Sequence, residues 1–147
     1  MPLKSANVRA SAHIDASAQL GNGVVVEPDA YIGPNCVIGA GSRIMARAMV
    51  LRDTVMGADN VVHPYAVLGG DPQDVKYDEA ADAGRLEIGD GNQFREHVTV
   101  SRGAGAEGAT RIGAQCFFMA GAHVGHNAKI GDRVILTNQA AVAGHVW

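Results

Sequence analysis

The chain repeats itself every six residues, and this period restricts its fold more than any other feature. A six-residue period matches neither the 3.6-residue repeat of an amphipathic helix nor the two-residue alternation of a half-buried strand. It is typical of short strands joined by tight turns, with one large apolar side chain per repeat pointing inward. The apolar series runs through Val8, Ile14, Leu20, Val26, Ile32, Ile38, Ile44, Val50, Met56, Val62, Leu68, Ile88, Phe94, Val100, Ile112, Phe118, Val124, Ile130, Leu136 and Val142.

A second, smaller residue follows four positions after each apolar one, as at Ala30, Cys36 and Ser42. The residue directly after the apolar one is often glycine, as in Ile38-Gly39 and Ile130-Gly131. Three repeats close one triangular coil of 18 residues, and parallel strands in successive coils lie about 4.8 Å apart. The sequence therefore predicts an all-β solenoid with continuous internal ladders of apolar side chains.

The composition agrees with one domain over residues 1–147. Hydrophobic residues make up 47% of the chain but aromatic ones only 5%, so the core has to be built from Val, Ile, Leu and Ala. A net charge of −3 gives no support for nucleic-acid binding, which usually needs a basic surplus. No apolar run approaches the roughly 20 residues of a membrane span, and we expect a cytoplasmic protein. Cys36 and Cys116 occupy small corner positions and are expected to pack inertly.

Two intervals interrupt the repeat, and interruptions of a regular solenoid are where functional groups are commonly placed. We expect loops at about 69–87 and about 101–111. Most of their residues are expected to be solvated surface. The first loop is more informative, because Gln73, Asp74 and Lys76 bring an amide, an acid and a base within four positions.

Three histidines near the end of the chain form the candidate catalytic centre. His123 and His126 are three residues apart, and His145 follows in the closing Ala-Gly-His-Val. Because one coil is 18 residues, His126 should stack on Gly144, about one 4.8 Å rung away, with His145 beside it. A neutral imidazole can remove a proton from a hydroxyl near neutral pH. We predict that His126 is a general base.

Several segments taken together resemble one known family. They are Gly-Asp-Pro-Gln-Asp-Val-Lys-Tyr (70–77), Arg-Leu-Glu-Ile-Gly-Asp (85–90), Arg-Glu-His-Val-Thr-Val-Ser-Arg-Gly (95–103), Ala-His-Val-Gly-His-Asn (122–127) and Ala-Gly-His-Val (143–146). In this order and spacing they are similar to the acyl-carrier-protein:UDP-N-acetylglucosamine O-acyltransferases, which begin lipid A synthesis. The six-residue repeat alone indicates only the wider hexapeptide-repeat superfamily.

The resemblance implies a left-handed parallel β-helix that forms a homotrimer with active sites between neighbouring chains. It implies transfer of a (3-hydroxy)acyl group from the phosphopantetheine of acyl carrier protein to the 3-hydroxyl of UDP-N-acetylglucosamine, with no metal or other cofactor. His126 matches the catalytic base, and Gly144 lies where a backbone N–H serves the oxyanion. The residues that match substrate-binding positions, or lie beside them, are Gln73, Asp74, Lys76, His123 and His145.

Two departures from the family pattern are visible. Asn127 stands where the family usually has Asp, so a carboxylate that could support an imidazolium is missing. The chain also stops at Trp147, whereas the family continues with more coils and a C-terminal helical region, which we expect to be absent here.

Three other functions stay open at this point. The first is a related hexapeptide acyltransferase that uses acyl-CoA or another sugar. The second is a γ-type carbonic anhydrase-like protein, which needs three histidines converging on zinc between subunits. The third is a non-catalytic β-helical scaffold that stacks through its open coil ends.

Overall fold

The computed structural model describes residues 5–81 and 84–147, and every regular element within them is a β-strand. This described part contains no helix that could cross a membrane. The first sheet holds β1 (Asn7–Val8), β4 (Val25–Val26), β7 (Arg43–Ile44), β10 (Val61–Val62), β13 (Gln93–Phe94), β16 (Phe117–Phe118) and β19 (Ile135–Leu136). The second holds β2 (His13–Ile14), β5 (Tyr31–Ile32), β8 (Met49–Val50), β11 (Val67–Gly70), β14 (Thr99–Ser101), β17 (His123–Val124) and β20 (Ala141–Val142). The third holds β3 (Gln19–Leu20), β6 (Val37–Ile38), β9 (Thr54–Met56), β12 (Arg85–Ile88), β15 (Ala109–Ile112) and β18 (Lys129–Ile130).

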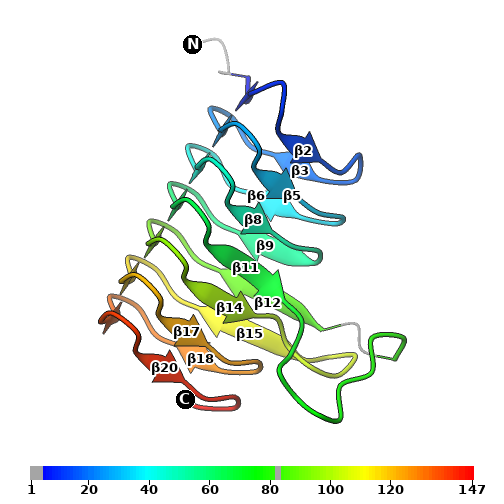
Figure 1. Cartoon of the computed structure of the whole chain (residues 1–147), viewed down its shortest axis with the longest axis vertical. Coiled ribbons are helices and arrows are strands. Elements are labelled where there is room, and N and C mark those ends of the chain that lie inside the picture. The colour runs from blue at the N-terminus through cyan, green and yellow to red at the C-terminus, as the bar shows by residue number, and fades with distance from the viewer. Residues whose placement is uncertain (1–4, 82–83) are drawn as a thin grey trace.

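The strands stack as the coils of a parallel solenoid. Each strand pairs in parallel with the strand one coil away, so that Val8 lies opposite Val26 and Val124 opposite Val142. Figure 1 shows the coils following one another from the N-terminal end to the C-terminal end, with one strand of each coil in each sheet. The predicted 18-residue coil and its parallel ladders are confirmed.

The predicted apolar ladders form the core. Ile32, Val50 and Leu68 are fully buried one above another in the second sheet, and the first and third sheets contribute equivalent rows. Phe94 and Phe118 stack face to face, with ring centroids 4.9 Å apart. Burying one such side chain contributes about 1.5–3 kcal/mol, so the ladders are the main source of stability.

The small corner residues are buried as well, and the polar ones among them bond the coils together. Asn60 Oδ1 accepts the Asn92 N–H at 2.8 Å, and Asn92 Oδ1 accepts the Cys116 N–H at 2.8 Å. Cys36 and Cys116 are both buried free thiols, and burial raises the pKa of each. This agrees with the inert packing expected of them.

Both interruptions of the repeat lie at the same corner of the triangle, between the second and third sheets. We call the segment between β11 and β12 loop 1 and the segment between β14 and β15, residues 102–108, loop 2. Strands extend into the intervals expected as loops, because β11 ends at Gly70, β12 begins at Arg85 and β15 begins at Ala109. Loop 1, described over residues 71–81 and 84, projects well beyond the other corners in Figure 1.

Candidate active site

One position of this corner recurs in every coil and carries most of the candidate chemistry. It lies two residues after the inward-facing apolar residue of the second sheet. It is Ala16 in the first coil, and the following coils have Pro34, Arg52, Gly70, Arg102, His126 and Gly144 there. Proline at one of these positions has no N–H to donate, so the coil does not need a backbone hydrogen bond from this position. The corner thus leaves the position available for other groups.

His126 stacks on Gly144 as predicted from the coil length. The backbone N–H of His145 donates to the His126 carbonyl at 3.0 Å, which joins the two corners. A Cβ atom on Gly144 would lie 2.9 Å from His126 Nε2, so this nitrogen has room only because residue 144 has no side chain. Within residues 5–81 and 84–147, the Gly144 N–H has no hydrogen-bond acceptor. An imidazole nitrogen and an unpaired N–H therefore lie on adjacent rungs.

The Asn127 side chain determines which nitrogen of His126 carries the proton. Asn127 Oδ1 accepts the Ala104 N–H at 2.8 Å, and Asn127 Nδ2 donates to the Ala104 carbonyl at 3.2 Å. The amide oxygen therefore faces His126, where it lies 2.9 Å from Nδ1. An amide oxygen can only accept, so in the neutral ring Nδ1 carries the proton and Nε2 is the unprotonated nitrogen. Asn127 thus orients the ring of His126 and at the same time fastens loop 2.

His123 lies on β17, one strand before the corner, and is half-buried. Its Nδ1 is 2.8 Å from Thr99 Oγ1 on the adjacent strand β14. Burial lowers the pKa of His123, and the contact with Thr99 opposes this only in part. The ring is therefore neutral at pH 7, because its ordinary pKa is already about 6.5.

His145 is exposed and follows Gly144 in the next coil, where its ring contacts that of His126. The two rings meet edge to face, with centroids 5.0 Å apart. His145 has a φ of 62°, in the left-handed region that residues with a Cβ seldom adopt. The corner imposes this conformation at equivalent positions too, for example at Asn35 and Asp53. The backbone conformation alone thus does not mark His145 as functional.

Loop 1 carries its three predicted site residues on a tight turn. Lys76 N–H donates to Asp74 Oδ1 at 2.9 Å, and Tyr77 N–H donates to the Asp74 carbonyl at 2.9 Å. The side chains of Gln73 and Lys76 are exposed. No hydrogen bond or ion pair among the described residues joins these side chains to His123, His126 or His145. Within one chain the structure brings the histidines together but does not bring the loop residues to them.

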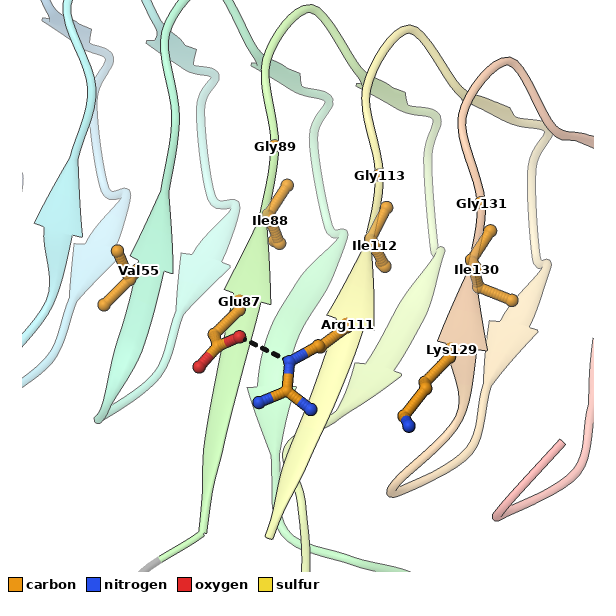
Figure 2. Close-up of a pocket in the computed structure, with 10 residues that line it drawn as sticks. All are labelled: Val55, Glu87, Ile88, Gly89, Arg111, Ile112, Gly113, Lys129, Ile130 and Gly131. Atoms are coloured by element: carbon orange, nitrogen blue, oxygen red, sulfur yellow. Dashed lines mark hydrogen bonds and ion pairs between the residues drawn. The ribbon is translucent and has the colours of Figure 1, made fainter. Parts of the chain in front are cut away.

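A surface groove of about 730 Å³ lies elsewhere and contains none of the predicted site residues. It runs along the outer face of the third sheet, between a row of polar side chains and a column of glycines (Figure 2). Glu87 accepts from Arg111 at 2.7 Å in that row, and Lys129 continues it. Gly89, Gly113 and Gly131 line its other side.

Two of the remaining histidines stack on tyrosine rings. His13 stacks on Tyr31 and His97 on Tyr65, with centroids 5.1 and 5.4 Å apart. In the described ranges, no three His, Cys, Asp or Glu side chains of one chain lie together so that they could hold a metal ion.

Comparison with known proteins supports the resemblance seen in the sequence. Residues 11–46 and 109–144 match the family described as bacterial transferase hexapeptide (six repeats). Over 139 residues the chain is 38% identical to the acyl-[acyl-carrier-protein]–UDP-N-acetylglucosamine O-acyltransferase of Syntrophobacter fumaroxidans, covering 93% of this chain and 53% of that protein. The crystal structure of the UDP-N-acetylglucosamine O-acyltransferase of Moraxella catarrhalis superposes with a TM-score of 0.90 at 35% identity, over 94% of this chain and 53% of that one. The Bacteroides fragilis enzyme gives 0.89 at 39% identity, over 93% and 53%.

The chain belongs to the hexapeptide-repeat transferase family. Its match to the UDP-N-acetylglucosamine O-acyltransferases confirms the predicted left-handed parallel β-helix. The chain spans about half the length of the relatives it matches, and the match is to their amino-terminal part.

In this hexapeptide-repeat chain, sequence reasoning assigned no role to Arg102, although it was part of a recognised segment. Arg102 occupies the same corner position as His126, one coil away, and its side chain is only 2% exposed. Its place in the corner series that also contains His126 is the signal that could have indicated it. Thr99 lies opposite His123 in the ladder, so the strand register could have indicated it. Ala104, which contacts Asn127, carries no such signal because its contact depends on the folded loop.

Proposed function

We propose that this protein is an acyltransferase that moves a (3-hydroxy)acyl group from acyl carrier protein to the 3-hydroxyl of UDP-N-acetylglucosamine. Relatives 36–38% identical to the chain are named for acyl transfer from acyl carrier protein to UDP-N-acetylglucosamine. The observation that carries the proposal is the unprotonated Nε2 of His126 beside the unpaired N–H of Gly144. Acyl transfer to a hydroxyl needs such a pair, a base for the hydroxyl proton and a donor for the oxyanion.

The proposed reaction requires no covalent enzyme intermediate. His126 Nε2 takes the proton from the sugar hydroxyl as its oxygen attacks the thioester carbonyl. The Gly144 N–H stabilises the oxyanion that forms on the carbonyl oxygen, an effect worth roughly 2.7–4 kcal/mol in enzymes where such a donor has been removed. The oxyanion then collapses, the C–S bond breaks, and the leaving thiolate takes the proton back from the imidazolium. Asn127 Oδ1 accepts from Nδ1 throughout and keeps the ring in place.

His123, His145, Gln73, Asp74 and Lys76 are proposed to bind and orient the substrates. The neutral ring of His123 suits a hydrogen bond to a sugar or acyl oxygen. Because the exposed loop 1 residues make no contact with the histidines of their own chain, we propose that they serve the site of a neighbouring chain in a homotrimer. A measured native mass of three chains is expected, and a monomeric active protein would overturn this part of the proposal.

The decisive test is His126→Ala with His97→Ala as the matched control. His97 lies on another corner, with a similar φ of 61°, and only stacks on Tyr65. We expect His126→Ala to lower acyl transfer about 10²–10⁴-fold, the usual contribution of a general base, with the fold intact by circular dichroism. His97→Ala should retain the wild-type rate. Equal turnover in wild type and His126→Ala would refute the assignment.

The donor is tested by assaying acyl carrier protein and acyl-CoA thioesters side by side with UDP-N-acetylglucosamine as acceptor. Preference for the carrier-protein thioester supports the proposal. Equal or better use of the CoA thioester would instead identify a related hexapeptide acyltransferase. The cytoplasmic location expected from the sequence stays a prediction.

A further inference from the structure

Arg102, which the proposed mechanism does not use, is buried at the base of loop 1. Its guanidinium Nη2 lies 2.6 Å from Asp71 Oδ1 and donates to the Tyr77 hydroxyl at 2.5 Å. Its Nη1 donates to the Gly69 carbonyl at 3.3 Å, and its backbone N–H donates to the Gly70 carbonyl at 2.8 Å. Arg102, the residue directly after β14, thus holds the strand that leads into loop 1 and two residues within the loop.

Because Arg102 is buried, its guanidinium depends on loop 1 for its charge partner and for most of its hydrogen-bond acceptors. A guanidinium removed from water is stable only when a charge and several acceptors replace the lost hydration. Asp71 supplies the charge, and Tyr77 and Gly69 supply acceptors. If segment 71–77 moved away, a buried charge would lose its partners. The contacts of Arg102 therefore favour one position of the segment strongly over others.

Asp71 and Tyr77 are also fastened from other directions. Ser101 Oγ donates to the Asp71 carbonyl at 3.3 Å, and Arg52 Nη2 donates to the Tyr77 hydroxyl at 3.4 Å. The Tyr77 hydroxyl in turn lies 3.4 Å from Asp71 Oδ1, which connects the two. The ends of the segment are thus tied together at one point, on the rigid end of β14.

The residues between these two ends are the ones proposed to bind substrate. Gln73, Asp74 and Lys76 lie between Asp71 and Tyr77, and the tip at Val75 is fully exposed. The tip makes a turn closed by Asp74, so its shape depends on the separation of its ends. Holding the two ends therefore sets where the three side chains point.

We propose that Arg102 is a positioning residue, which acts through Asp71 and Tyr77 to hold segment 73–76 ready for substrate. This inference rests on the proposed function, because it assumes that the segment binds the substrates. Arg102 itself is too buried to touch them. It acts by removing the cost of ordering the segment when a ligand binds, which raises affinity without new contacts.

We call the contacts of Arg102 with Asp71 and Tyr77 the clasp. The test uses Tyr77→Phe and Asp71→Asn, because these variants alter the clasp but leave Arg102 and its own coil unchanged. The matched control is Arg111→Gln, which breaks an exposed ion pair with Glu87 on the third sheet. Three quantities are measured in each protein: hydrogen exchange of the Lys76 and Tyr77 amides without ligand, and kcat and KM for UDP-N-acetylglucosamine. Binding of that nucleotide is also measured directly by calorimetry.

In both clasp variants we expect amide exchange in 76–77 to rise about tenfold, the effect of losing one hydrogen bond to a charged group. KM and Kd should rise by a similar factor, while kcat changes less than threefold. The control should match wild type in all of them. Conversely, His126→Ala should lower kcat and leave the exchange of the loop amides unchanged.

Unchanged exchange in both clasp variants would overturn the clasp, and faster exchange with unchanged KM and Kd would overturn its positioning role. A merely structural role for Arg102 would lower the melting temperature without separating KM from kcat. If the wild-type protein neither binds nor acylates the nucleotide, the proposed function fails. The exchange data then still decide whether Arg102 holds the segment.

Discussion

The two loops share one corner of the triangle and are held by opposite means. Loop 1 is held by side chains, with Asp71 and Tyr77 gathered around Arg102, and its tip stays exposed. Loop 2 is held mainly by close backbone packing, to which the Asn127 side chain adds two hydrogen bonds. A Cβ atom on Gly103 would meet the backbone of Gly108, and one on Gly108 would meet the backbone of Ala104. The difference indicates that the two loops have different roles. Loop 1 displays side chains to the outside, whereas loop 2 forms a tight wall whose contact with Asn127 supports the ring of His126.

The largest effect that tests this contrast comes from the same substitution in the two loops. Gly103→Ala would push a Cβ atom into the backbone at Gly108, and we expect it to lower the free energy of unfolding by about 3 kcal/mol. Gly70→Ala, at the last residue of β11 before loop 1, meets open space. It should be neutral, or stabilising by about 0.4–1 kcal/mol, because alanine restricts the unfolded chain. Urea denaturation measures both, and equal losses in the two variants would contradict the contrast.

A smaller effect is expected from Asn127→Ala, which detaches loop 2 from the catalytic corner. It removes two hydrogen bonds to Ala104 and the acceptor for His126 Nδ1, and should cost about 2 kcal/mol. Activity should fall as well, because the ring of His126 is then free to turn. Asn127→Asp keeps the acceptor for Nδ1 and should retain more activity than Asn127→Ala, although it loses the bond from Nδ2 to the Ala104 carbonyl. Equal rates for the two variants would show that the acceptor does not matter.

The regular coils could be predicted from the sequence, and the contacts of the two loops only in part. The position of a repeated apolar residue such as Val124 can be read from the six-residue pattern, because that pattern sets both the coil length and which residues are buried. The stacking of His126 on Gly144 followed from counting 18 residues, and the structure confirms it. The contacts of Asn127 and Arg102 could not be counted in this way. The contact of Asn127 with Ala104 spans 23 positions, and that of Arg102 with Gly69 spans 33. Both depend on the paths of the loops, which do not follow the six-residue repeat.

The smallest effect is the pH dependence of the free energy of unfolding, which we expect to come from histidines of the coils and not from the two loops. Burial lowers the pKa of His123 and of His63, and neither lies in a loop. A histidine whose folded pKa is below its unfolded value of about 6.5 binds its proton more readily in the unfolded chain. Its stabilising effect is therefore present above pH 6.5 and is lost as the pH falls from there through the folded pKa.

We thus expect the free energy of unfolding to decrease as the pH falls below about 6.5, and by less in His123→Gln, which cannot titrate. The control is His97→Gln on an exposed corner, which should follow the wild-type profile. Urea denaturation at a series of pH values measures all three proteins. If His123→Gln shows the full wild-type pH dependence, the buried ring opposite Thr99 is not a source of it, and the frame owes its acid sensitivity to other groups, of which His63 is the first to test.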